Sequence, residues 1–148
     1  MFSQTVEYAL RAAVWLAENE GSPQTNRKIA AATQVPAPYL SKLMQSLGRA
    51  GLVRGARGAG GGFELTRRAA AVSVLDVVNA VDPICRIKTC PLSLASHKTR
   101  LCPLHKKLDE AIATIETSFR TTSLAEVLGD NPRHRPLCDF VEIAGASR

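Results

Sequence analysis

The chain has 148 residues, 45% of them hydrophobic, and its 19 Lys and Arg residues outnumber its 13 Asp and Glu residues to give a net charge of +6. This size and apolar content are typical of one packed domain with an appendage. The sequence contains neither an apolar run of the roughly 18 residues that a membrane span needs nor an N-terminal charged segment followed by an apolar one, as in a signal peptide. We therefore expect no membrane partner and a cytoplasmic location.

Positive charge is concentrated in the first half of the chain. Residues 1–68 hold nine basic and four acidic side chains, a net charge of +5, whereas residues 69–148 hold ten and nine, a net charge of +1. A polyanion such as DNA is the partner that this distribution suggests. Basic surfaces also keep proteins soluble, so charge alone does not decide the function.

Apolar residues at helical spacing predict a helix over residues 3–19, with Ser3 as its N-cap and a face that packs in the core. A second, short helix begins after Thr25, whose hydroxyl can cap it, and a turn with Pro36 and Pro38 follows. A third helix is expected over residues 38–50. Its polar faces carry hydrogen-bond donors: Tyr39, Ser41, Lys42, Gln45 and Arg49.

A glycine-rich hairpin follows the third helix, with strands expected at residues 52–54 and 63–65. Helix, turn, helix and hairpin together predict a mainly α fold with a small β-hairpin, the winged helix-turn-helix. In this fold the second helix of the motif enters the major groove, and the hairpin reaches the DNA backbone or minor groove. Arg57 lies at the expected wing tip, where Gly58 and Gly60 permit close approach to DNA.

Beyond the wing, Ser73 and Asp76 have the form of a capping box that opens another helix, which Asp82 and Pro83 end. Helical periodicity is then lost until a long helix begins near Pro103. Apolar residues advance along this helix by four, three, four and four positions, close to a coiled-coil seam: Leu104, Leu108, Ala111, Ile115 and Phe119. The stripe could pack on the chain's own body, but we favour a dimer seam. A last short helix with an N-terminal cap is expected over residues 122–128.

These patterns divide the chain into four parts. Residues 1–82 form the predicted DNA-binding domain, residues 83–102 a cysteine-containing sensor loop, residues 103–128 a dimerisation helix with a short C-terminal helix, and residues 129–148 a flexible tail.

Three cysteines, Cys85, Cys90 and Cys102, lie within 18 residues, and His105 follows three positions later. In a cytoplasmic chain such clustering favours metal binding or redox chemistry over a structural disulfide. Thiolates suit zinc and the iron of iron-sulfur clusters equally well, so the spacing does not choose between them. We expect Cys138, in the tail, to remain free.

The sequence resembles the Rrf2 family of winged-helix transcription regulators over roughly residues 1–128. The resemblance rests on EYALR at residues 7–11, YLSKL at residues 39–43, AGLV at residues 50–53, RGAGGGFEL at residues 57–65, and the cysteine loop followed by a long helix and SLA at residues 123–125. It implies a homodimer with crossed long helices that binds a double-stranded DNA operator.

Carried over position by position, the resemblance puts Pro38, Tyr39, Ser41 and Lys42 at the DNA-facing start of the recognition helix and Arg57 on the wing. Ser41 stands where relatives carry a glutamate that helps to discriminate bases, so a different operator is expected. The complete predicted DNA surface also includes Thr25, Arg49, Gly58 and Gly60.

The resemblance also implies a 2Fe-2S or 4Fe-4S cluster held by the three loop cysteines. In some relatives an acidic residue on the partner's first helix, just before Tyr-Ala-Leu-Arg, completes the cluster, and Glu7 matches that position. His105 is the competing fourth ligand. The eleven residues between Cys90 and Cys102 exceed the commoner family spacing of roughly five to seven, which leaves the cluster type open.

We therefore predict a sequence-specific DNA-binding regulator, a repressor, that senses redox state, nitric oxide or iron-sulfur status. One alternative keeps DNA binding but makes the cysteines a thiol switch or a zinc site. Another is a cluster-binding or protein-interaction module that uses the winged fold without touching DNA. An enzyme is not expected, because no motif joins a nucleophile, a base and an orienting group.

Overall fold

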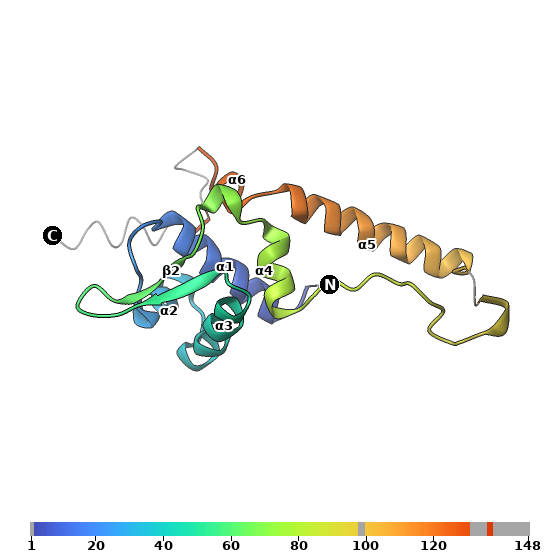
Figure 1. Cartoon of the computed structure of the whole chain (residues 1–148), viewed down its shortest axis with the longest axis horizontal. Helices are drawn as coiled ribbons and strands as arrows, with labels where there is room; N and C mark the ends of the chain where they lie inside the picture. Colours follow the sequence, from blue (N-terminus) through green and yellow to red (C-terminus); the bar gives the residue numbers. More distant parts are fainter. Residues whose placement is uncertain (1, 98–99, 131–135, 138–148) are drawn as a thin grey trace.

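The computed structural model of the protein describes residues 2–97, 100–130 and 136–137, and it shows a winged-helix domain from which a long arm extends (Figure 1). The domain contains α1 (Gln4–Glu18), α2 (Asn26–Thr33), α3 (Ala37–Arg49), β1 (Val53–Ala56), β2 (Gly62–Leu65), the 3-10 turn η1 (Ala69–Ala71), α4 (Val74–Val81) and α6 (Leu124–Leu128). The arm contains the loop after α4, the 3-10 turn η2 (Ala95–His97) and α5 (Pro103–Thr121). This mainly helical architecture with an antiparallel hairpin confirms the predicted fold class.

Helix α1 lies at the centre of the domain because its small apolar side chains allow close packing. Ser3 caps the helix as predicted, since its hydroxyl accepts a hydrogen bond from the backbone N–H of Val6 (3.3 Å). Ala9, Ala13 and Leu16 share the buried face of the helix at helical spacing. The interpretation of this stripe as core is confirmed.

The helix-turn-helix forms where the capping residue and the prolines predict it. Thr25 accepts from the backbone N–H of Lys28 (3.3 Å) and starts α2. Gln34 ends that helix in the left-handed conformation (φ 55°), and α3 begins directly after Pro36. The apolar side of α3 is buried against the rest of the domain: Leu40, Leu43, Met44 and Leu47. The polar side of α3 is therefore turned outward.

The wing is attached to the start of α2. Strands β1 and β2 pair in antiparallel register from Val53 with Leu65 to Ala56 with Gly62. The hairpin makes a further β-bridge, outside the sheet, with Gln24. The backbone N–H of Gln24 donates to the carbonyl of Phe63 (2.8 Å), and the N–H of Phe63 donates to the carbonyl of Gln24 (2.7 Å). Because Gln24 directly precedes the cap of α2, this bridge sets the position of the wing relative to the helix-turn-helix.

Two capping boxes lie side by side where the chain leaves and re-enters the domain. Ser73 and Asp76 form the predicted box at α4, and Ser123 and Glu126 form another at α6. The two serines also form an isolated antiparallel bridge. Leu124, the first residue of α6, is completely buried in the main core. The chain after α5 thus returns to the winged domain, while the predicted domain boundaries stay a prediction.

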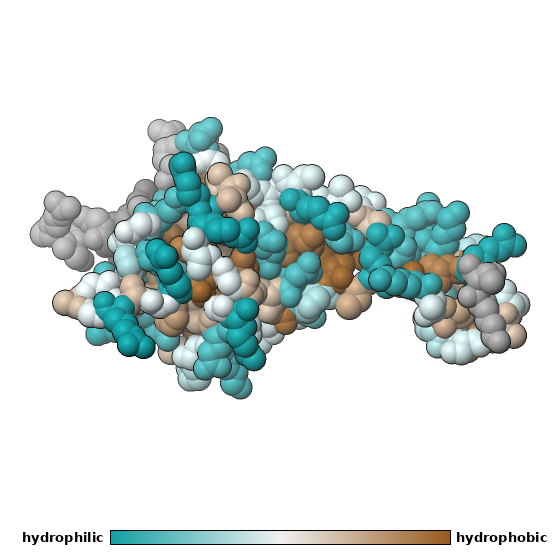
Figure 2. Space-filling model, viewed as in Figure 1, coloured by the Kyte–Doolittle hydropathy of each residue, from teal (hydrophilic) through white to brown (hydrophobic). Residues whose placement is uncertain are grey.

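The arm has little core of its own. The structure describes α5 in full, and none of its residues is buried. Leu104 and Leu108, near the start of α5, are 64% and 48% exposed. Phe119, near its other end, lies 5.3 Å from the ring of Phe2 and packs on the domain. Figure 2 shows apolar surface where the arm leaves the domain and again toward its far end.

The loop before α5 runs beside the helix and is held to it by charge. The Arg86 guanidinium contacts the Asp109 carboxylate (2.6 Å) and lies 3.6 Å from Glu116. The same carboxylate accepts a hydrogen bond from the backbone N–H of Ile87 (2.8 Å).

Within the described part of the chain, no helix combines the length and apolar character needed to cross a membrane. Cys138 and most of the predicted tail lie outside the described residues.

Candidate nucleic-acid interface and cysteine arm

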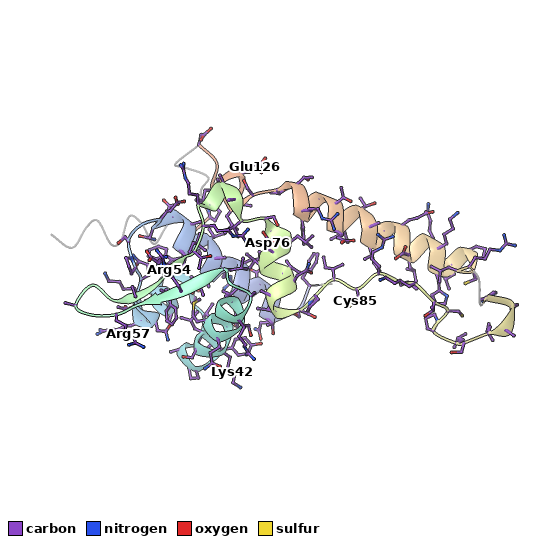
Figure 3. All side chains as sticks on the ribbon, viewed as in Figure 1. Lys42, Arg54, Arg57, Asp76, Cys85 and Glu126 are labelled. Atoms are coloured by element: carbon purple, nitrogen blue, oxygen red, sulfur yellow. The ribbon has the colours of Figure 1, made fainter. Side chains whose placement is uncertain are left out.

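The outward face of α3 is basic and polar. Lys42 and Arg49 are both exposed, and Lys42 makes no ion pair with any described residue. Figure 3 shows Lys42 on α3 and Arg57 on the hairpin, at the lower edge of the domain in that view. Arg57 is also exposed and likewise unpaired within the described residues. A recognition helix and a wing thus present free positive charge, which suits phosphate contact.

Tyr39, predicted to face DNA, also anchors the recognition helix. Its hydroxyl hydrogen-bonds with the Thr5 hydroxyl (2.5 Å), and its ring packs edge-on against Tyr8 with centroids 5.4 Å apart. Both partners belong to α1. Pro38, the second residue of α3, is exposed beside it. Tyr39 therefore fixes how α3 projects from the domain.

Ser41 is half-buried and its hydroxyl is already engaged. It donates to the Ala37 carbonyl (3.2 Å) and accepts from the Asn26 amide (3.4 Å). Its contact with Asn26, the first residue of α2, links the two helices of the motif. A serine here presents a short side chain held close to its own helix, whereas a free acidic side chain would reach outward.

The other residues of the predicted DNA surface, Thr25 and those of the wing, divide by role. Thr25 is exposed and serves as the cap of α2, and Arg57 is free at the loop. Gly58 has a positive φ of 97°, which favours glycine, whereas a side chain at Gly60 would meet no heavy atom within 4 Å. The more constrained glycine is Gly62, where a Cβ would lie 2.4 Å from the backbone of Gln24.

Gln24 is a positioning residue that the sequence patterns missed. It is buried, its side-chain amide donates to the Ser22 carbonyl (2.9 Å), and its backbone carries the bridge to Phe63. The available signal was a polar residue between Pro23 and the Thr25 cap, which is common in any loop. Only the paired backbone shows that this residue holds the wing.

The cysteine arm contains two thiols that lie beside histidines. Cys90 is buried, and the His97 imidazole beside it, with the backbone N–H groups of Leu92 and Leu94, holds the pKa of its thiol below the ordinary value. Ser93, whose φ is positive at 52°, lies between these two residues, and its backbone N–H donates to the Cys90 carbonyl (3.0 Å). This environment favours the thiolate, the form that binds metals.

Cys102 and Cys85 have different surroundings. The Sγ of Cys102, at the N-cap position of α5, lies 3.2 Å from the Nδ1 of His105. Cys85 is exposed near the base of the loop, and its thiol contacts the carbonyl of Pro83 (3.5 Å) (Figure 3). Its partner is a backbone oxygen and not a second metal-binding side chain.

The described residues of a single chain do not assemble the predicted three-cysteine site. No three of their His, Cys, Asp and Glu side chains converge on a position that could hold a metal ion. Glu7 lies on α1, where its carboxylate pairs with Arg11 (3.0 Å). The donor chemistry suits a metal, but the three cysteines are not gathered, and the ligand assignments stay predictions.

A helix-turn-helix with a basic outward face, joined to a wing that carries a free arginine, defines a winged-helix DNA-binding protein. Residues 2–130 match the family model Rrf2, described as an iron-dependent transcriptional regulator. Because this match covers most of the chain, the protein belongs to the Rrf2 family of DNA-binding transcription regulators. The resemblance found in the sequence motifs is confirmed.

Relatives support the same assignment. A protein of Aquifex aeolicus (strain VF5), named as an HTH-type transcriptional regulator, is 27% identical over 137 residues, which cover 90% of this chain and 95% of the relative. The solved structure of T. potens IscR matches with a TM-score of 0.75 and 25% identity over 92% of each chain. CymR (YrzC), the global cysteine regulator of B. subtilis, supports the fold, with a TM-score of 0.70 and 23% identity over 84% of this chain and 92% of CymR. The family consists of transcription regulators and not of enzymes, which agrees with the prediction that this chain is not an enzyme.

Proposed function

We propose that the protein is a homodimeric repressor that acts in the cytoplasm, binds a specific double-stranded operator and responds to redox state, nitric oxide or iron-sulfur status through its cysteine arm. The observation that carries this proposal is the free positive charge of Lys42 and Arg57 on two elements with fixed relative positions. The Gln24 to Phe63 bridge links the wing to α2, and Tyr39 links α3 to α1. Such preorganised contacts bind DNA in one orientation.

The homodimer is supported by the uncovered face of α5. Leu104 and Leu108 expose apolar side chains that an isolated chain leaves in water. At the base of the arm, an apolar cavity of about 300 Å³ lies between α1, α4, α5 and α6, with Val14 and Phe119 in its walls. A second copy related by a two-fold axis would cover the exposed face of each helix. It would also place two recognition helices on the two halves of an operator.

The sensor part of the proposal rests on the donors of the arm. Cys85, Cys90, Cys102 and His105 offer thiols and an imidazole, and Glu7 of a partner subunit is a candidate ligand. A bound 2Fe-2S or 4Fe-4S cluster would supply iron that reacts with oxidants and nitric oxide. The second candidate is a zinc or thiol switch, which the thiolate-favouring surroundings of Cys90 support.

The DNA-binding proposal is tested by selecting an operator from random duplex DNA and measuring its affinity over a range of salt concentrations. Arg57→Ala and Lys42→Ala should each weaken binding and lower the slope of log K against log salt by about one. Arg120→Ala, on α5, removes the same charge far from the proposed interface and should leave the slope unchanged. Unchanged affinity in both interface variants would overturn the assignment of this surface.

The dimer and the sensor have separate tests. Sedimentation should show a dimer that Leu108→Asp dissociates, whereas Leu92→Asp, on the loop, leaves it intact; a monomeric native protein would contradict the dimer. Protein purified without oxygen should be brown and contain iron and sulfide. A colourless protein that binds zinc instead, or that takes up no metal after anaerobic reconstitution, would move the sensor to zinc or thiol chemistry.

A further inference from the structure

The outward face of α3 carries one neutral side chain that can form hydrogen bonds. On the side of the helix opposite its buried apolar residues, helical spacing places four exposed residues: Pro38, Lys42, Gln45 and Arg49. Lys42 marks this face in Figure 3. The lysine is a point charge suited to phosphate, and Arg49 is the last residue of the helix, whereas bases are contacted mainly from the start of a recognition helix. Gln45 is therefore the candidate for reading a base.

The side-chain amide of Gln45 is free. It is exposed and makes no hydrogen bond with any residue that the structure describes, and the Arg49 Nε donates to the backbone carbonyl of Gln45 (3.4 Å) and not to its amide. A glutamine amide offers one acceptor oxygen and an NH₂ donor. Adenine presents the matching N7 acceptor and N6 donor in the major groove, and the two groups can pair through both atoms.

Ser41, one helical turn before Gln45, faces α2 instead of solvent. It is half-buried, and its hydroxyl donates to the Ala37 carbonyl (3.2 Å) and accepts from the Asn26 amide (3.4 Å). A serine has a single O–H donor, and here the protein itself uses it. The resemblance places base discrimination at this position in relatives, but in this chain the free hydrogen-bonding group lies one turn further along the helix.

We propose that Gln45 is a base-reading residue of the recognition helix and that it recognises the adenine of an A·T pair through N6 and N7. The inference rests on the proposed operator binding and deepens it, because Gln45 lies outside the predicted DNA surface. Phosphate contacts by Lys42 and Arg57 would set the position of the protein on the duplex. Lys42 precedes Gln45 by three residues on the same helical face, so this contact would bring the amide to the groove.

The test uses the full-length protein and the operator selected from random duplex DNA. Affinity is measured for the selected operator and for each single base-pair substitution in one half-site. Wild type should lose about 5- to 150-fold on substitution of one A·T pair. Gln45→Ala should lose a similar factor on the selected operator and no longer discriminate at that pair alone, with an unchanged salt slope because no phosphate contact is removed. Ser41→Ala is the matched comparison and should keep discrimination at every pair.

Two further measurements test the contact at the level of atoms. Replacing the recognised adenine by 7-deazaadenine removes N7 and keeps Watson–Crick pairing, so wild type should bind the modified operator more weakly. Gln45→Ala should bind the modified and unmodified operators equally. Gln45→Glu should change the preferred base at this position from adenine to cytosine, because a carboxylate accepts a hydrogen bond from the cytosine N4 amine.

The outcomes separate this inference from operator binding itself. If Ser41→Ala and not Gln45→Ala relaxes a base preference, or if the pair that depends on Gln45 is not A·T, the inference is wrong and operator binding stands. Equal wild-type affinity for the operators with adenine and 7-deazaadenine would overturn the contact with N7. If wild type binds DNA without preference for any pair, or does not bind it, sequence-specific operator binding fails together with the inference. Unchanged circular dichroism shows that the variants remain folded.

Discussion

The winged domain and the arm are held together by different interactions. In the domain, large side chains such as Leu40, Leu47 and Leu124 are completely buried, and the core joins elements from both ends of the chain. In the arm, α5 is described in full and buries no residue, and Cys90 is the buried residue of the described part of the preceding loop. Ion pairs between the loop and α5 hold the arm together instead.

Because of this contrast, the winged domain provides most of the folding stability, and the arm is the region that can respond to a signal. Burial of apolar area is the main source of folding free energy, at roughly 25 cal/mol per Å², whereas exposed ion pairs contribute about 0–1 kcal/mol each. The domain can therefore keep its DNA-binding geometry while the side-chain contacts of the arm change. Elements that move or bind ligands generally come from the less stable part of a protein.

The largest expected effect comes from opening a cavity in the domain. Leu40→Ala should lower the free energy of unfolding by about 2–5 kcal/mol, because the side chain is fully buried in the core. Leu92→Ala, on the arm and 72% exposed, should change it by less than about 0.5 kcal/mol. Urea denaturation followed by circular dichroism measures both. Equal losses would show that the arm contributes to the core.

A smaller effect is expected where the wing meets α2. Gly62→Ala places a Cβ 2.4 Å from the backbone of Gln24 and should destabilise the domain by about 1–3 kcal/mol. Operator affinity should fall too, because the wing loses its attachment. Gly55→Ala, on β1 and outside the predicted DNA surface, is the matched control, since the nearest atom to its new Cβ would be the Gly62 carbonyl oxygen at 4.0 Å. Wild-type operator binding by Gly62→Ala would show that the bridge is dispensable.

Inside the arm, the attachment of the loop should depend on Asp109. The Arg86 guanidinium, and then the backbone N–H of Ile87, hold the pKa of this carboxyl below its ordinary value. Because the folded pKa is lowered, the stabilisation is complete above the ordinary value and is lost as the pH falls through the lowered one. Hydrogen exchange at Ile87 should therefore accelerate in acid beyond the intrinsic pH dependence of exchange.

The Asp109→Asn variant removes the same charge at neutral pH. It should increase exchange at Ile87 there while exchange in α3 stays unchanged. Equal protection in the variant and the wild type would show that other contacts hold the loop to α5.

The smallest effect on folding is expected at Glu7. Its ion pair with Arg11 is exposed and spans one helical turn, so Glu7→Gln should change the free energy of unfolding by about 0.5 kcal/mol or less. A clear loss of bound iron without loss of stability would identify Glu7 as a ligand from the partner subunit. Unchanged metal content would remove it from the candidate site.

Much of the winged domain could be predicted because its signals are local. Ser3, Thr25 and Ser73 cap the helices that follow them, and apolar spacing predicts the buried side of α3. These features depend on residues three or four positions apart, which share one face of a helix. The strand limits were less accurate, since β1 and β2 extend to Ala56 and Gly62 through pairing that glycine-rich sequence does not reveal.

The candidate sites were predicted as residue types and not as arrangements. Lys42 and Arg57 are exposed and free as the sequence suggests, but Tyr39 and Ser41 make contacts with α1 and α2 that no local pattern contains. The cysteines were recognised by their spacing along the chain. Spacing does not report which of them lies beside a histidine, because the loop has no periodic structure to place its side chains.

The sequence by itself determined the helix-turn-helix, the glycine-rich wing and the family, since each depends on neighbouring residues and their conformational preferences. The tertiary structure alone decided that Gln24 holds the wing, that Leu124 returns to the core, and that His97 lies beside Cys90. These are contacts between residues far apart in sequence or within an irregular loop. They arise when packing and backbone pairing choose among the many conformations that local preferences allow.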